Sequence, residues 1–328
     1  MKTHTTQIIS LLLITFLISG CYTQKPIKIQ VLKPAELNIP ANIHNISVAY
    51  KIINTKGKDE SLYYVNQSGF EDTDNLDSVF TKQAALYFSH SVSDSEKYTV
   101  QNSSEIHKLD DRYWSTDKDT IMKICQKDQS DAVIILNQFI TREFAFHSYD
   151  YGYLFPTIYV VKNIHWQMYL NDGITHFNYY DKDTLTLENY EYYDPESIPL
   201  NFNRQYIIDE VAYLTAEEFK KQISPIWKEE ERKYIHNTKF SKASDFAKNE
   251  MWKDAAKEWM PFTKSENNFR KAAAAYNMAL AAEMEGNLEL AIFWINIAIT
   301  NDPEEDYQAY KNILLRRRNE VRQLEKQL

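Results

Sequence analysis

The feature that most constrains this chain is its N-terminus, because it decides where the folded part begins. The first twenty residues combine a basic second residue, an apolar run from Ile8 to Ile18 and the small pair Ser19-Gly20, which Cys21 follows at once. A basic start, an apolar core of about 7–15 residues and small residues before the cut are typical of a secretory signal. We therefore expect residues 1–20 to be a signal peptide and the mature chain to begin at Cys21.

The four residues Ile18-Ser19-Gly20-Cys21 resemble the lipobox of bacterial lipoprotein signals. This resemblance implies that the Cys21 thiol carries a diacylglycerol and that the new amino terminus carries a third acyl chain. The apolar run is too short to remain as a membrane span, which takes about 20 residues. The chain is therefore expected to be anchored to a membrane by lipid at Cys21 rather than to cross it.

The remaining cysteine, Cys125, would then have no partner within the chain, so no disulfide framework is expected. It falls in an expected helix, where such a cysteine is usually a small buried apolar residue. The formal net charge of −9 argues against nucleic-acid binding, which requires a basic face. The one concentrated basic patch, 316–318, has Glu320 and Glu325 nearby and is interpreted as a solvated helix face.

The chain is long enough for two domains. Residues 21–42 contain Pro26, Pro34 and Pro40 without a sustained period, so we interpret them as a lipidated tether. A mixed α/β domain is expected over 43–235 and a helical domain over 236–328. The fold class is therefore α+β, with a sheet domain followed by an all-α domain.

The first domain alternates β-branched runs with helical periods, which favours parallel crossovers, and then continues as an antiparallel meander. Its expected strands cover 43–53, 98–100, 131–137, 157–161, 164–170 and 174–180. Its expected helices cover 76–90, a stretch that Ser115-Thr116-Asp117 caps and that runs to about Lys127, and 203–235, the last with a break at 223–227.

The pair Asp172-Gly173 is a hairpin signal. A two-residue turn here places His176 opposite Tyr169 and His165 opposite Tyr180. The two histidines then share a face but lie about 13 Å apart along the ladder. That separation is too large for one zinc ion, and we expect two hairpin histidines among aromatic residues.

The second domain shows helical periods only, over 239–250, 252–264, 267–284, 288–300 and 304–325. The segment Ala272–Pro303 resembles one tetratricopeptide unit. It has small residues at packing positions (Ala279, Ala282, Ala291 and Ala298), a Gly286-Asn287 turn and a closing Asp302-Pro303. It departs from that family at Ala275, where Trp is favoured. A weaker unit with Trp252, Ala255 and Trp259 precedes it.

The sequence contains no zinc, phosphate-loop, dinucleotide or nucleophile-elbow motif, so no catalytic, cofactor or metal role is assigned to any residue. What remains is an acidic, Tyr-rich region over 181–196. A glycosidase requires two carboxylates at a defined separation. Sugar-binding sites also commonly place Tyr next to Asp. The residues concerned are Asp181, Asp183, Glu188, Tyr190, Glu191, Tyr192, Tyr193, Asp194 and Glu196.

The lipobox, the segment Pro34-Ala35-Glu36-Leu37 and the break at 223–227 together resemble a family of uncharacterised bacterial envelope lipoproteins with a tetratricopeptide-like tail. Arg232-Lys233-Tyr234-Ile235 departs from that family's Arg-x-Tyr-Tyr. The resemblance implies no known active site, and our first hypothesis is a non-catalytic lipoprotein that scaffolds or binds a protein partner through 239–328. The alternative is a glycan-binding or glycan-processing lipoprotein that uses 181–196. Because no Asp follows Cys21 directly, an outer-membrane position facing the periplasm is expected.

Overall fold

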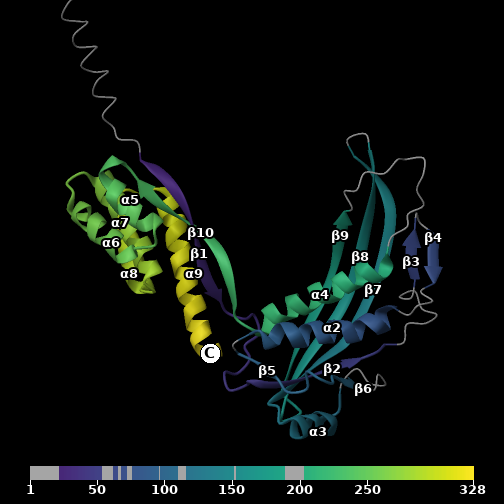
Figure 1. Ribbon diagram of the computed structural model, residues 1–328. Coiled ribbons are helices and arrows are strands. Elements are labelled where there is room, and N and C mark those ends of the chain that lie inside the picture. The colour runs from purple at the N-terminus through teal and green to yellow at the C-terminus, as the bar shows by residue number, and fades with distance from the viewer. Residues whose placement is uncertain are drawn as a thin grey trace, which may run out of the picture. The chain divides into compact units, whose positions relative to one another are not determined.

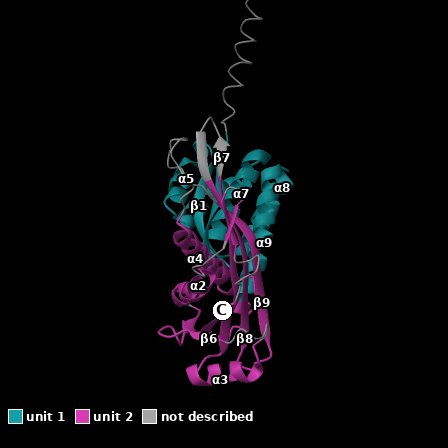
Figure 2. Ribbon diagram, turned by 90° about the vertical axis from the view of Figure 1, so that its right-hand side faces the viewer, with its two compact units in different colours: residues 1–34, 226–325 teal, residues 35–225, 326–328 magenta. Residues whose placement is uncertain are grey.

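A computed structural model describes residues 22–53, 62–65, 68–71, 76–95, 97–109, 116–150, 153–188 and 203–328. The chain forms two compact units, coloured separately in Figure 2. Unit 1 contains Met1–Pro34 and Ile226–Glu325, and unit 2 contains Ala35–Pro225 and Lys326–Leu328. Unit 2 holds the mixed sheet and unit 1 holds the C-terminal helices, which confirms the expected α+β class.

The sheet of unit 2 is built around the long strand β7 (Ala132–Asp150). Strand β2 (Asn45–Lys51) runs parallel to β7, and also to the short strands β5 (Thr99–Val100) and β6 (His107–Leu109). The other edge of β7 continues as an antiparallel meander through β8 (Tyr153–Leu170) and β9 (His176–Glu188). The expected combination of parallel crossovers and an antiparallel meander is confirmed.

Two further strands extend the sheet. Strand β3 (Leu62–Val65) pairs in parallel with the far end of β7, and β4 (Ser68–Glu71) pairs with β3. The prediction of separate strands at 157–161 and 164–170 is wrong, because β8 runs through both. The polar pair between them, Lys162-Asn163, stays in the ladder, and the buried Lys162 ammonium forms an ion pair with Asp181 on β9.

The hairpin register is the predicted one. His176 lies opposite Tyr169 and His165 lies opposite Tyr180. Gly173 closes the turn at φ +69°, a conformation that favours glycine.

Helices α2 (Leu76–Ser93) and α4 (Arg204–Ile223) lie against one face of this sheet (Figure 1). The packing there is aromatic: the Phe219 ring is stacked on Trp166 at 4.8 Å and lies 5.2 Å from Phe88. All three side chains are almost fully buried, and burial of each contributes roughly 1.5–3 kcal/mol. Pro225 follows α4 and prevents the helix from continuing.

Helix α3 (Lys118–Asp128) covers the opposite face through its apolar side. Asp117 caps its N-terminus by accepting a hydrogen bond from the Thr120 N–H. Ile121 and Cys125 pack against Ala49 and Val133, which alternate with the residues that face α2 and α4.

Unit 1 begins with a two-stranded antiparallel ribbon, defined here as β1 (Thr23–Lys33) paired with β10 (Ile226–His236) (Figure 1). The expected tether over 21–42 and the expected helix through 235 are both wrong on this point. In β1 the side chains of Ile27, Ile29 and Val31 alternate inward with exposed Lys28 and Gln30, a strand period that the flanking prolines obscure.

The helices of unit 1 follow the predicted pattern closely. They are η2 (Thr238–Phe240), α5 (Ser241–Lys248), α6 (Trp252–Trp259), η3 (Met260–Lys264), α7 (Asn268–Met284), α8 (Leu288–Asn301) and α9 (Glu305–Gln327). The run Ala272–Ala275 is fully buried, so neighbouring helices approach α7 closely. Gly286 turns the chain from α7 to α8 at φ +76°. Within the described ranges, no helix combines the length and apolar character that crossing a bilayer requires.

Candidate interaction surfaces of the helical unit

The ribbon is fastened to α7 by a side-chain amide that continues the strand ladder. Asn277 is completely buried. Its Oδ1 accepts a hydrogen bond from the Ile235 N–H, and its Nδ2 donates one to the Ile235 carbonyl, both at 2.7 Å. This fixes the register between β10 and α7 and satisfies backbone groups that would otherwise be buried without partners.

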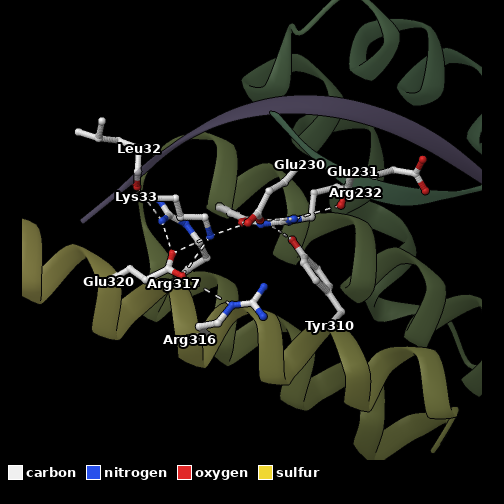
Figure 3. Close-up of polar contacts among 10 residues, drawn as sticks. Leu32, Lys33, Glu230, Glu231, Arg232, Tyr310, Arg316, Arg317 and Glu320 are labelled. Atoms are coloured by element: carbon white, nitrogen blue, oxygen red, sulfur yellow. Dashed lines mark hydrogen bonds and ion pairs between the residues drawn. The ribbon is translucent and has the colours of Figure 1, made fainter. Parts of the chain in front are cut away.

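A buried charge network holds the same ribbon at its centre (Figure 3). Arg232 on β10 donates from Nη2 to Glu283 Oε1 at 2.8 Å and from Nε to Glu283 Oε2 at 3.0 Å. The Tyr310 hydroxyl on α9 donates to the same carboxylate at 2.7 Å. The Arg232 and Glu283 side chains are only 3% and 5% exposed. A planar bidentate pair of this kind is geometrically selective.

The network extends along the ribbon toward its far end (Figure 3). Lys33 contacts both Glu230 and Glu320, and Arg317 donates to the Leu32 carbonyl at 3.0 Å and to Glu320. Burial opposes ionisation of Glu230, but Lys33 and Arg232 outweigh it and lower its pKa to about 2. For Glu320 burial is likewise outweighed by Arg317 and Lys33, so its pKa is lowered.

These carboxylates stabilise the unit rather than transfer protons. A general acid or base works best with a pKa near the operating pH, whereas Glu230 and Glu320 are held ionised beside cations. Arg317 is 11% exposed and joins this network, so the interpretation of 316–318 as a solvated face is wrong for its central residue. Arg316, at 59% exposed, fits that interpretation.

Helix α8 carries a partly exposed apolar stripe, which we define as Leu290, Phe293, Trp294 and Ile297. Trp294 and Ile297 also pack against the core of unit 1. The buried residues of α8 are Ala291, Ile295 and Ala298. Leu290 is 41% exposed and Phe293 is 55% exposed, while Trp294 and Ile297 are half-buried. The spacing i, i+3, i+4, i+7 places the four on one side of the helix. A stripe with this spacing is how a helix meets a partner helix or groove.

A second apolar area surrounds the first described residue, Tyr22. Its ring lies 4.5 Å from Phe269 and 6.2 Å from Phe240, edge-on in both cases. Beside it is an open pocket of about 230 Å³ whose lining includes Tyr22, Gln24, Phe269 and Tyr307. Gln24 donates a hydrogen bond to Asp306 at 2.6 Å across this region. The chain is therefore packed into unit 1 from Tyr22 onward.

The predicted site residues are placed as follows. Cys21 lies outside the described residues, one position before Tyr22. The His165 ring donates from Nε2 to Asn178 Oδ1 at 3.1 Å and stacks on Tyr180 at 4.1 Å, while His176 contacts the Ile174 carbonyl. Burial lowers the pKa of His165. The part of the chain that the structure describes brings together no group of three metal-binding side chains.

The acidic region is not brought together by the described part of the structure. Asp181 faces inward and is paired with Lys162, whereas Asp183 is exposed. The Glu188 side chain and residues 190–196 lie outside what is described. Cys125 is buried, and burial raises the pKa of its thiol.

A further polar row, missed by sequence reasoning, crosses the α3 side of the sheet. The Asn137 amide donates to Gln167 Oε1 at 2.9 Å, and Gln167 donates to Asn178 Oδ1 at 2.9 Å. Asn137 sits where the β7–β8 register shifts, between Leu136 and Gln138. These amides link three strands at the bulge, although the buried Asn137 Oδ1 accepts no hydrogen bond from the described residues.

Comparison with known families assigns most of the chain. The family model described as domain of unknown function DUF8603 matches residues 43–235. The chain belongs to the DUF8603 family. The DUF8603 match includes the sheet and β10 but not β1, and a second model, domain of unknown function DUF6340, matches residues 241–318 over the helices. No curated protein matches the chain.

Proposed function

We propose that this chain is a lipid-anchored protein of the bacterial cell envelope that binds a protein partner through its helical unit and carries out no catalysis. The observation that carries the proposal is the apolar stripe on α8. Apolar side chains scattered singly over a surface are ordinary, but a contiguous patch on a structured element marks an interaction site.

The stripe also suits the chemistry of a protein partner. Phe and Trp dominate binding energies because they bury large area with few rotatable bonds. Phe293 and Trp294 contact each other edge-on at 5.4 Å and present one aromatic surface. Helix α8 is held from behind by its alanines against α7, so its surface is rigid before binding.

The anchor is supported by the sequence Ile18-Ser19-Gly20-Cys21 and the apolar run before it. We propose that the protein lies at the outer membrane and faces the periplasm. This location is supported by the residue after Cys21, which is Tyr22 and not Asp. Mass spectrometry of the membrane fraction tests the anchor. The expected N-terminal peptide begins at Cys21 and carries acyl chains. The Cys21→Ala variant is expected either to leave the membrane fraction or to keep its unprocessed N-terminus.

Cross-linking in cells tests the partner. A photoreactive residue at Phe293 is expected to give one discrete protein adduct, and Ile297→Asp is expected to abolish it. The matched control is a photoreactive residue at Met251, which is similarly apolar and 46% exposed in the same unit. An adduct pattern that is the same at 293 and 251, or that survives Ile297→Asp, contradicts the proposal.

A further inference from the structure

We infer that the end of unit 1 around Tyr22 seats directly on the lipid surface, with Phe269 and Met260 in contact with the bilayer interface. This inference rests on the proposed lipidation of Cys21 and adds to it a specific lipid-facing surface. The occupant is the membrane that holds the acyl chains.

Only a short length of chain separates the proposed anchor at Cys21 from the folded unit. A free tether over 21–42 would span up to roughly 70 Å when extended. The structure leaves no such tether, because Tyr22 packs against Phe240 and Phe269 and β1 begins at Thr23. Adjacent Cα atoms are about 3.8 Å apart, so an acylated Cys21 brings the lipid glycerol to the surface of unit 1.

The surface of unit 1 near Tyr22 carries exposed apolar side chains. Phe269, whose ring meets Tyr22, is 42% exposed and is the second residue of α7. Met260 is 41% exposed and begins η3, the same short helix that contains Phe262. Behind them the Phe240 ring lies 5.1 Å from Phe262, so the exposed side chains stand on a packed aromatic base. Tyr is enriched at membrane–water interfaces, and exposed Phe adds apolar contact to the binding that acyl chains provide.

The short distance between this end and the acyl chains leaves no room for a protein partner. A partner bound over Tyr22 and Phe269 would have to fit between unit 1 and the bilayer. Only Cys21 separates Tyr22 from the acyl chains in the proposed mature protein. That gap is shorter than the diameter of a helix with its side chains, about 10 Å.

If this end of unit 1 lies on the membrane, residues near Tyr22 should contact lipid while residues at the other end of the ribbon should not. Residue 268 adjoins Phe269 and is exposed, whereas Lys228 is exposed on β10 opposite Val31. Val31 lies eight residues after Thr23, about 26 Å along the strand. Position 268 should therefore contact the interface while position 228 stays in water.

The experiment places a nitroxide at Asn268→Cys or, as the matched control, at Lys228→Cys in the full acylated chain carrying Cys125→Ala. The protein is reconstituted in phosphatidylethanolamine–phosphatidylglycerol vesicles and isolated by flotation. Collision of the label with oxygen, which concentrates in lipid, is compared with collision with a water-soluble nickel chelate. We expect the oxygen-to-nickel ratio to rise on vesicle binding at 268 and to stay unchanged at 228.

The outcomes separate this inference from the proposed function. A chain that lacks acyl groups at Cys21 and does not float overturns both. An acylated chain that floats with both labels in water overturns only the seating. A rise at both positions also overturns it, because the ribbon would then lie along the membrane.

Discussion

Arg232 and Glu283 meet inside unit 1 as a bidentate ion pair, with N···O distances of 2.8 and 3.0 Å and both side chains nearly without solvent contact. The pair joins β10 to α7 through two residues that are 51 positions apart in the chain. Because neither charged group is hydrated in the folded protein, each is stabilised mainly by its interaction with the other.

Removing one partner of this pair should therefore be costly. We expect Glu283→Gln to lower the free energy of unfolding of unit 1 by about 3 kcal/mol, since Arg232 keeps its charge but loses its main partner. Urea titration read by hydrogen exchange of α7 peptides measures this. Glu285→Gln is the control, because its pair with Lys253 is exposed and worth less than about 1 kcal/mol. Equal effects of the two variants would contradict the assignment.

The stability of unit 1 should also depend on acid. The pKa of Glu230 is about 2 in the folded chain and lies near its ordinary value of 4.5 when the chain is unfolded. A lowered folded pKa contributes stability above the unfolded value, and this is lost as pH falls from about 4.5 toward 2. The contribution is at most about 3 kcal/mol.

The measurement compares urea midpoints of the wild type at pH 7 and pH 3. Glu230→Gln should lower the midpoint at pH 7 and reduce its dependence on pH over this window. If Glu230→Gln and the wild type lose the same stability between pH 7 and pH 3, Glu230 is not the titrating group.

Two glycines in the left-handed region should respond differently to alanine. At Gly173 an added Cβ would lie 2.8 Å from Lys118 Cγ and 3.0 Å from the Lys118 carbonyl oxygen, whereas at Gly286 nothing lies within 4 Å. Both substitutions incur about 1–2 kcal/mol of backbone strain, and Gly173→Ala adds a steric clash. Thermal unfolding should show the larger loss for Gly173→Ala, and the reverse order would contradict the described turn.

Cys125 should be chemically inert in the folded chain. Cys125 is 6% exposed, and burial raises the pKa of its thiol, so little thiolate is present at neutral pH. Iodoacetamide at pH 7.5, followed by peptide mass spectrometry, should alkylate Cys125 much more slowly in buffer than in 6 M urea. Equal rates in the two solvents would show that the α3 side of the sheet is open.

Sequence reasoning succeeded where the signal was local. The Asp172-Gly173 turn fixed the register of His165 and His176, and the alanine spacing of α7 and α8 fixed the helical hairpin. The sequence of β10 predicts a helix, because its lysines, glutamates and Arg232 all have high helix propensity. Nothing within the segment reveals that a partner strand exists. The conformation of β10 is decided by pairing with β1, nearly 200 residues earlier in the chain.

The ion network was beyond sequence reasoning for the same reason. Lys33 and Glu320 are 287 positions apart, and nothing near either residue identifies the other. Arg317 illustrates the limit, because its neighbours Arg316 and Arg318 have the same charge while Arg317 alone reaches the Leu32 carbonyl. Side chains that meet through tertiary packing carry no periodic signature.

The ribbon permits a direct test of unit 1 as a module. Lys33 and Ile226 are Cα partners at its end, so replacing residues 34–225 by Asn-Gly should close it as a two-residue hairpin. The core around Trp259, Tyr276 and Ile295 lies entirely in unit 1. We expect a helical, cooperatively unfolding protein by circular dichroism. A chain that unfolds without a cooperative transition would show that unit 1 depends on unit 2.

The same ribbon has a mechanical consequence. If residue 21 is held in a bilayer, a pull on unit 2 reaches the anchor along the covalent backbone of β1, because Lys33 leads into unit 2 and Thr23 leads to the anchor. The hydrogen bonds between β1 and β10 lie across that line of tension. The helices of unit 1 thus lie beside the strand that bears the load, so such a pull need not unfold the α8 stripe that we propose as a partner-binding surface.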